Sequence, residues 1–163
     1  MVLNHNEAVT DQFESSGVTF ERTFGNPGAD PYPNFSGNRV GDFQSGIGQN
    51  GLFKATFSET LKDVAFAFVS APGTSSFQVL MNGVLVASAV APTTFNSTTN
   101  YFGFKDLQFN QLIITVESSD HVFMMDNLQT TAAVPEPASF AMLSLGLVLL
   151  GTVAHRSKHN TKV

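Results

Sequence analysis

The chain has 163 residues, 42% hydrophobic and 13% charged, with a formal net charge of −5 and no cysteine. This length suits one domain with a buried core, and the absence of cysteine excludes disulfides and thiolate-bound metals. Residues 1–155 hold five basic against thirteen acidic residues, a balance of −8. An acidic domain without a basic face cannot neutralise phosphates, so nucleic acid is excluded as a partner.

The first eleven residues carry no strand or helix pattern, and we expect segment 1–11 to be disordered. The opening MVLNHNEAVTDQF has no basic n-region followed by an apolar h-region. It is therefore not a signal peptide.

The stretch from Phe13 to Leu128 has an all-β pattern. Short runs of Phe, Val, Ile and Thr alternate with Gly, Pro, Asn, Asp and Ser clusters, and no window shows a helical stripe. Strands are predicted at about 18–24, 38–43, 52–57, 64–70 and 101–104. In the run 64–70, Val64, Phe66 and Phe68 alternate with alanines, which indicates one face packed on a core.

Two strand pairs are predicted from their turns. Asn82-Gly83 lies between apolar runs within 77–88 and is the dipeptide that favours a type I′ hairpin. Residues 111–129 give a second pair, with Leu112, Ile114 and Val116 on one face and a Ser-Ser-Asp turn before 122–128.

Eight or nine short strands without helical crossovers predict two antiparallel sheets packed face to face. We expect a jelly-roll-like β-sandwich over residues 12–129. The Gly-, Pro- and Asn-rich segment 24–51 is expected to be mostly loop, and 91–100 a shorter loop.

The C-terminal segment differs in composition from everything before it. Residues 130–139, which contain Pro135, Glu136 and Pro137, read as a linker. Residues 140–155 are almost entirely apolar and predict a hydrophobic helix, and 156–163 form a basic tail with Arg156 and Lys158. As a helix, the fifteen residues 140–154 span about 22 Å, which is short for a bilayer unless the flanking residues join. The alternative is a C-terminal core helix, although the run has no polar face.

The order of these features resembles the PEP-CTERM family of exported bacterial proteins. The resemblance covers Pro135-Glu136-Pro137, the hydrophobic segment from Phe140, and Arg156 with Lys158. It implies export to the cell envelope, membrane anchoring through the C-terminus, and recognition by exosortase, a membrane protease. Because such proteins begin with a signal peptide, one is expected upstream of Met1.

No enzyme signature is present. The four histidines are scattered, and the sequence holds neither H-E-x-x-H nor G-x-S-x-G. A calcium site is the stronger hypothesis, since Glu14 in QFESSG and Asp126 in MMDNLQ look similar to the acids that hold structural calcium in carbohydrate-binding jelly rolls. Asn127 and backbone carbonyls would add the further oxygens that Ca²⁺ needs. The alternative is that Glu14 is a surface acid and Asp126 faces solvent or caps a turn.

The aromatic composition bears on sugar binding. The chain has sixteen Phe, two Tyr and no Trp, whereas sugar platforms use Trp or Tyr, whose rings stack while a polar edge stays wet. Phe66, Phe68 and Phe77 are therefore expected in the core. Tyr32, in the loop DPYPNF, is the candidate ligand contact, and the alternative is that it packs over the prolines of its own loop.

Two functions follow for the domain. One is a non-enzymatic surface or extracellular-matrix protein, and the other is a glycan-binding module acting on extracellular polysaccharide. A sheet face with Asn, Gln and an exposed Tyr would favour the second function, and a face with only Ser and Thr the first.

Overall fold

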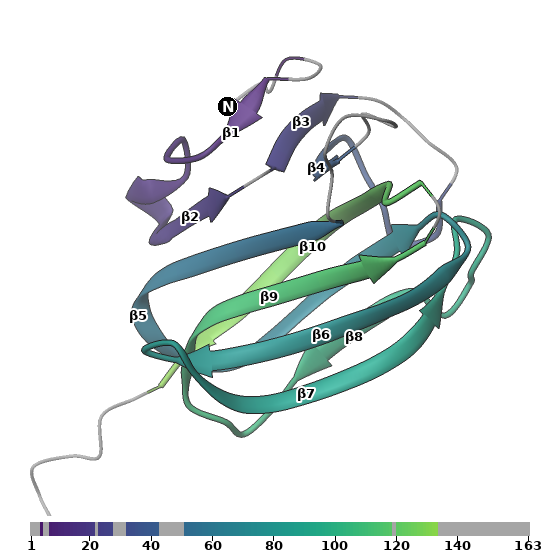
Figure 1. Ribbon diagram of the computed structural model, residues 1–163. Coiled ribbons are helices and arrows are strands. Elements are labelled where there is room, and N and C mark those ends of the chain that lie inside the picture. Colours follow the sequence, from purple (N-terminus) through teal and green to yellow (C-terminus); the bar gives the residue numbers. More distant parts are fainter. Residues whose placement is uncertain are drawn as a thin grey trace, which may run out of the picture. The chain divides into compact units, whose positions relative to one another are not determined.

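The part of the chain that the structure describes is built almost entirely of β-strands (Figure 1). The structure is a computed structural model, and it describes residues 4, 7–21, 23–27, 32–42, 51–118 and 120–133. The strands are β1 Ala8–Val9, β2 Val18–Glu21, β3 Thr23–Pro27, β4 Asn38–Asp42, β5 Leu52–Ser70, β6 Gly73–Met81, β7 Val84–Thr93, β8 Tyr101–Phe104, β9 Phe109–Glu117 and β10 Phe123–Ala132, with one short 3₁₀ turn, η1, at Glu14–Ser16. The all-β, antiparallel prediction is confirmed.

Strand β5 organises the sheet because it belongs to two ladders. Its first half pairs with β2 on one side and β9 on the other, and its second half pairs with β10 and β8. The prediction of two separate strands at 52–57 and 64–70 is therefore wrong, since β5 is continuous over 19 residues. The polar residues between the halves mark a shift in register, between Thr56 and Leu61, where the strand passes from one ladder to the other.

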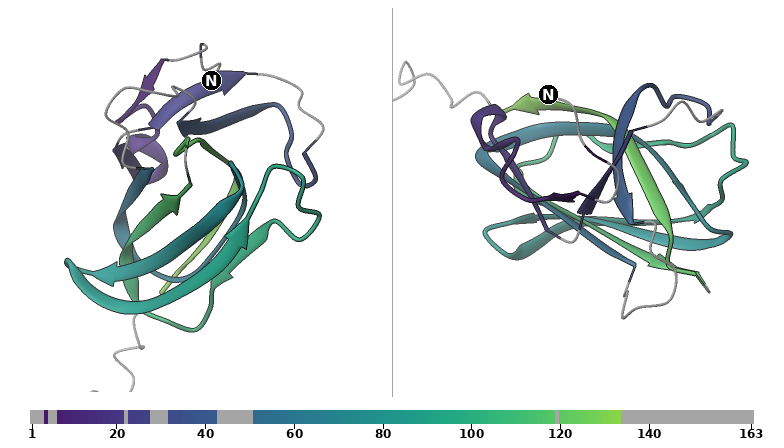
Figure 2. Two further views of the ribbon diagram at one scale, coloured as in Figure 1. Left: turned by 45° about the vertical axis from the view of Figure 1, so that its right-hand side comes forward. Right: turned by 90° about the horizontal axis from the view of Figure 1, so that it is seen from above.

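The strands form two layers that share β5 (Figures 1 and 2). One layer has the order β2, β5, β9, β6, β7, and the other has β1, β3, β4, β10, β5, β8. The antiparallel pairs are nested along the chain, and the innermost pair is β6 with β7. Around it lie, in order, the second half of β5 with β8, the first half of β5 with β9, and β4 with β10.

Phenylalanine rings fill the space between the layers. Phe66, Phe68 and Phe77 are buried, as predicted. The ring of Phe77 stacks on Phe102 with centroids 4.6 Å apart and meets Phe68 edge-on at 5.4 Å. Leu112, Ile114 and Val116 of β9 are buried on one face, which confirms the alternation predicted there.

The two predicted strand pairs have different outcomes. Asn82 and Gly83 join β6 to β7 with φ angles of 51° and 82°, so the hairpin is confirmed, with both positive angles that a type I′ turn requires. The second pair is wrong, because both edges of β9 are occupied by β5 and β6. Strand β10 pairs instead with β4 and β5.

The strands extend beyond several predicted bounds. Strand β1 lies within the segment expected to be disordered, and Val9 is fully buried. Strand β7 continues to Thr93 and β10 to Ala132, which shortens the predicted loop and linker. The backbone N–H of Ala133 still donates to the carbonyl of Thr60, so the domain ends at Ala133.

Candidate functional site

A loop of five residues, Tyr32–Ser36, lies against the bulge in β10. The Oδ2 atom of Asp126 accepts a hydrogen bond from the backbone N–H of Ser36 at 2.6 Å, and the side-chain amide of Asn127 donates to the carbonyl of Asn34 at 2.5 Å. Asn34 and Asn127 have φ angles of 64° and 51°, a left-handed conformation that Asn tolerates better than most residues. The β10 register shifts at this point, between Asp126 and Gln129, and leaves Asn127 exposed.

The same loop is bound from its other side by Asn100. The Asn100 side-chain amide donates to the carbonyl of Pro33 at 2.6 Å, and its Oδ1 accepts from the Asn34 amide at 2.8 Å. Asn100 is 1% exposed, and its own carbonyl accepts from the N–H of Phe68 in β5. Since the loop is held on two sides by hydrogen bonds, its position on the domain is fixed.

Tyr32 is half-buried and packs on two aromatic rings. Its ring stacks on Phe95 with centroids 5.7 Å apart and meets Phe35 edge-on at 6.0 Å. These contacts give Tyr32 a structural role beside the proposed ligand contact. The two partner rings belong to its own loop and to the segment after β7.

A pocket of about 380 Å³ lies where β2, η1, β4 and β10 meet. Its apolar lining is Phe13, Val18, Phe20, Val40, Phe57, Met125 and Leu128, and its polar lining is Ser16, Asn38, Arg39, Asp126, Asn127 and Thr130. An apolar floor with a few convergent polar groups is the general form of a small-molecule site.

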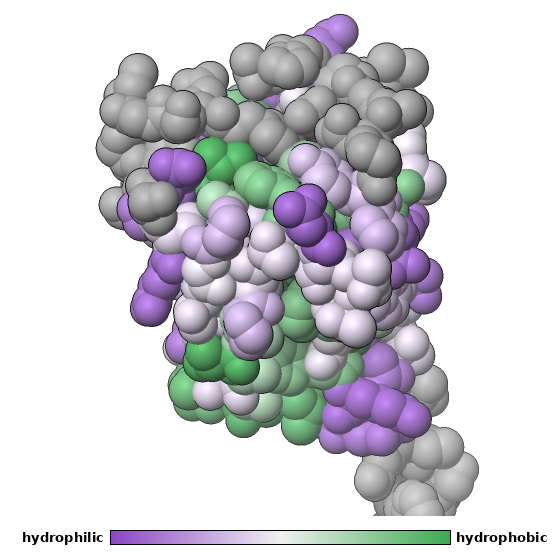
Figure 3. Space-filling model, turned by 90° about the vertical axis from the view of Figure 1, so that its right-hand side faces the viewer, coloured by the Kyte–Doolittle hydropathy of each residue, from purple (hydrophilic) through white to green (hydrophobic). Residues whose placement is uncertain are grey.

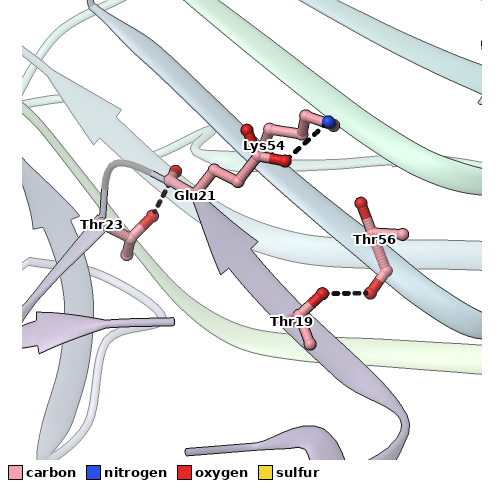
Figure 4. Close-up of polar contacts among 5 residues, drawn as sticks. All are labelled: Thr19, Glu21, Thr23, Lys54 and Thr56. Atoms are coloured by element: carbon pink, nitrogen blue, oxygen red, sulfur yellow. Dashed lines mark hydrogen bonds and ion pairs between the residues drawn. The ribbon is translucent and has the colours of Figure 1, made fainter. Parts of the chain in front are cut away.

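Strand β2, which supplies one wall of this pocket, is held on β5 by side chains (Figure 4). The Lys54 Nζ lies 2.7 Å from Glu21 Oε1, and the Thr19 hydroxyl donates to the carbonyl of Thr56 at 3.5 Å. The Thr23 hydroxyl donates to the carbonyl of Glu21 at 3.2 Å just beyond the strand.

The predicted calcium ligands lie in the linings of two different cavities. Asp126 lines the pocket above, and Glu14 lines a neighbouring cavity of about 510 Å³ that shares Ser16, Phe57 and Thr130 with it. Asp126 already accepts two backbone N–H groups, from Ser36 and Asn127. Within the described residues, no group of three or more His, Cys, Asp or Glu side chains is arranged to hold a metal ion.

A second polar surface lies on the outer face of the layer that contains β8. Phe102 and Phe104 of β8 pack against the core, so the alternation along the strand turns Tyr101 and Gly103 outward. Tyr101 is 45% exposed. Across β5 from β8, Gln129 of β10 lies in register with Ala65, which pairs with Gly103.

These outward residues line a shallow depression of about 500 Å³. Its lining is Asp63, Val64, Ala65, Tyr101, Phe102, Gly103, Phe104, Lys105, Gln129, Thr130 and Thr131. The depression thus has a floor of small residues, one exposed aromatic ring, and amide and hydroxyl side chains beside it. We did not single out Tyr101 or Gln129 from the sequence, although the alternation of YFGF contains the signal for Tyr101.

The predicted sorting residues Pro135, Glu136, Pro137, Arg156 and Lys158 lie outside the described residues, as does the hydrophobic segment 140–155. In the part of the chain that the structure describes, no helix has the length and apolar character needed to span a membrane.

The residues described so far define an all-β domain, ending at Ala133, that carries two candidate surfaces. The family model of the PEP-CTERM protein-sorting motif matches residues 133–157. The chain therefore carries a PEP-CTERM sorting motif, as the resemblance implied. The match contains Pro135, Glu136, Pro137 and Arg156, and Lys158 follows it directly.

Two solved structures resemble the chain at low identity. One is the enzymatically active domain of tailspike protein 4 of bacteriophage CBA120, with 14% identity and a TM-score of 0.47, covering 79% of this chain and 21% of that chain. The other is TmCBM61 in complex with β-1,4-galactotriose, with 13% identity and a TM-score of 0.46, covering 80% and 99%. No curated protein sequence matches the chain. Both TM-scores lie below 0.5, so neither likeness carries an argument about function.

Proposed function

We propose that the chain is a non-enzymatic protein of the bacterial cell envelope or extracellular matrix, exported and then sorted through its C-terminus. The observation that supports this proposal is that the sorting motif begins at residue 133, directly after β10 ends at Ala132. A domain that is complete at this point can be presented outside the membrane while the segment that follows is recognised separately as the sorting signal.

The physical roles within the motif follow from its residues. The apolar segment 140–154 partitions into the bilayer, and Arg156 and Lys158 hold its end on the cytoplasmic side. Pro135 and Pro137 keep the intervening chain out of helix and sheet. A membrane protease such as exosortase then meets a backbone that is not already hydrogen-bonded.

Mass spectrometry of the mature C-terminus tests this proposal. Given a working signal peptide and an exosortase-bearing host, the protein should lose the segment from the Pro-Glu-Pro region onward. Glu136→Ala should block this processing, whereas Glu117→Ala, which changes an exposed acid at the end of β9, should not. An intact Val163 on protein from the natural host would show that the segment is only an anchor.

We further propose that the domain is a jelly roll. Its four nested pairs are those of a long hairpin whose two arms have been rolled together across two layers. This connectivity places the last strand, β10, between β4 and β5, with the sorting motif directly after it.

Binding of extracellular polysaccharide is the second candidate, and the depression beside Tyr101 favours it. A pyranose ring presents an apolar face that can stack on an exposed tyrosine ring, while Gln129 and Thr131 offer hydrogen bonds to its hydroxyls. Gln129 and Tyr101 are residue types expected on a sugar-binding face.

Affinity electrophoresis in the host's own extracellular polysaccharide tests this second candidate. Tyr101→Ala should weaken the affinity for the polysaccharide, measured from the retardation, by about tenfold. This corresponds to about 1.4 kcal/mol of lost stacking energy. Tyr32→Phe is the matched control, because it keeps the contacts with Phe35 and Phe95 and removes only the hydroxyl. If Tyr32→Phe lost affinity and Tyr101→Ala did not, the binding site would be the Tyr32–Ser36 loop. If the parent protein were not retarded, polysaccharide binding would be excluded and the matrix role would remain.

A further inference from the structure

Strand β7 is an apolar edge of the sheet. Among the strands that the structure describes, it pairs with β6 on one side and ends its layer on the other. Of the five exposed large hydrophobic residues in the described part of the chain, four lie on β7: Val84 70%, Leu85 53%, Val86 40% and Val90 69%. Figure 3 shows apolar surface along the lower part of the molecule, where β7 runs in Figure 1.

The edge also lacks the charges that usually protect an exposed strand. Natural proteins place Lys and other charged residues on edge strands to prevent them from pairing with other chains. No Asp, Glu, Lys or Arg occurs from Val64 to Phe104, a stretch that contains all of β6, β7 and β8. The protective features present are Pro92 and a register shift beside Leu85, and they lie near the two ends of the strand. The middle of β7 is unprotected.

We propose that β7 pairs antiparallel with β7 of a second copy of this chain. Charge favours this edge as the contact between two copies, because the acidic residues of the domain would repel a second acidic copy wherever they face each other. The uncharged β6–β7 edge is the place where two such domains can approach without that repulsion. An antiparallel edge is also self-complementary about a twofold axis, so the free N–H and C=O groups of each copy find partners in the other.

Other occupants fit the edge less well. A membrane surface attracts segments flanked by Lys, Arg, Trp or Tyr, and β7 has none of these. A glycan needs a stacking ring, and β7 contains no aromatic residue. A short, uncharged strand of Val, Leu, Ala and Ser fits another strand of the same kind.

The alternation of side chains restricts the register. Ala87 and Ala91 pack against the core, whereas Val90 lies opposite Ser76 on the outer face. A twofold axis perpendicular to the sheet keeps outer residues on the outer face. Each residue must therefore face a residue whose side chain lies on the same face of the sheet. The register with Ala89 facing itself meets this condition from Ala87 to Ala91 and places Ser88 opposite Val90.

Disulfide formation by single-cysteine variants tests both the pairing and the register, since the chain contains no native cysteine. The full chain is used in a mild nonionic detergent, which covers its hydrophobic segment. In Ala89→Cys the two thiols face each other, within the Cα separation of about 4.4–6.8 Å that a disulfide needs. In Val84→Cys they lie about 33 Å apart, ten residues along the paired strands.

We expect Ala89→Cys to form a covalent dimer at least about tenfold faster than Val84→Cys, because pairing raises the local thiol concentration only at the axis. Val84 is the matched control, since it lies on the same strand and is 70% exposed. Thr19→Cys, on β2 at the other edge of the layer, should form no covalent dimer. Equal rates for Ala89→Cys and Val84→Cys would show nonspecific clustering and overturn the proposal.

Charge substitution provides an independent test by sedimentation of the full chain in the same detergent. Val90→Lys and Val90→Glu should each dimerise more weakly than the parent, because the two like charges then lie diagonally across the twofold axis, within reach of each other's long side chains. An equimolar mixture of the two variants should dimerise again. A parent chain that stays monomeric at all concentrations, or a mixture that stays monomeric while the parent dimerises, would contradict pairing through β7.

Discussion

The Oδ2 atom of Asp126 accepts a hydrogen bond from the backbone N–H of Ser36 at 2.6 Å, across 90 residues of sequence. The Oδ1 atom of the same carboxylate accepts from the N–H of Asn127 at 2.7 Å. A single side chain therefore holds both the Tyr32–Ser36 loop and the bulge of β10.

We expect Asp126→Ala to lower the free energy of unfolding by about 1–2 kcal/mol, because two backbone donors lose a charged acceptor at a site that water still reaches. Asp126→Asn keeps one acceptor oxygen and should lose less. Urea denaturation of the two variants measures the difference. Equal stability of Asp126→Ala and the parent protein would show that the carboxylate does not hold the loop.

Calcium binding by Glu14, Asp126 and Asn127 remains a proposal with a direct test. A ligand that binds only the folded state raises its stability by about 2.7 kcal/mol at a hundred times the dissociation constant. Millimolar Ca²⁺ should then raise the melting temperature of the parent protein, and the rise should be absent in Asp126→Ala and reduced in Glu14→Gln. Magnesium at equal concentration controls for ionic strength. No rise in the parent protein would end the hypothesis.

Gly103 permits the close approach of β8 to β5. A Cβ atom at this position would lie 2.3 Å from the carbonyl oxygen of Val64 and 3.1 Å from the Cα of Ala65. Both contacts are with backbone that cannot move alone, so Gly103→Ala should cost about 1–3 kcal/mol or more, as overpacking does. Gly83→Asn is the control, because that site has open space and a φ of 82°, which Asn tolerates. Chemical denaturation should show a large loss only for Gly103→Ala.

The ion pair between Lys62 and Asp106, 2.8 Å apart, gives a prediction about pH. The hydrogen bond and charge of Lys62 hold the pKa of Asp106 below its usual value, and Asp106 raises the pKa of Lys62. Because the pKa of Asp106 is lower in the folded state, its contribution is present above the unfolded pKa of about 4 and is lost as pH falls through the folded pKa. Both groups are exposed, so the effect is small and screened by salt.

The variant Asp106→Asn isolates this effect, since Asn is compatible with the φ of 58° at this position. It should be slightly less stable than the parent at pH 7 and low salt, and the two proteins should converge at low pH or in high salt. Thermal melts across this range measure the difference. A gap that grows as the pH falls would contradict the assigned sign.

A fragment of residues 1–133 should fold without the sorting segment. Strand β10 ends at Ala132, and the Ala133 N–H still bonds to Thr60. The fragment should therefore show a strand-type far-UV spectrum and one cooperative melt. A fragment ending at Gln129 is the comparison, because it removes the pairs of Thr130, Thr131 and Ala132 with β5 and should melt at a lower temperature. Equal melting of the two fragments would place the end of the folded domain earlier.

Local patterns predicted the strands well because their causes lie within a few residues. The Asn82-Gly83 turn and the burial of Leu112, Ile114 and Val116 depend only on neighbouring backbone angles and on period-two alternation. Pairing partners depend on which strand edges are already occupied. That is why β9 and β10, which are adjacent in sequence, lie in different ladders.

The residues of the candidate sites also differ in whether their positions have local or long-range causes. Asp126 and Asn127 were chosen from the sequence, but their partners Ser36 and Asn34 lie some 90 residues away, beyond the reach of a local pattern. Tyr101 was predictable as an outward residue from its alternation with Phe102. Its neighbour Gln129 was not, because the bulge in β10 sets which residue of that strand lies beside Ala65.

The nested pairing of the strands also sets a time order for a secreted chain. The innermost pair, β6 with β7, is joined by two residues, whereas the outermost pair brings Met125 opposite Val40. Because long loops cost more entropy to close, the inner hairpin can form early and the outer pairs only later. A chain that crosses a membrane from its N-terminus delivers β10 last, and until then one edge of β4 and one edge of β5 stay unpaired. The sorting motif follows β10 without a gap, so translocation reaches this motif at the moment when the sheet can first be completed.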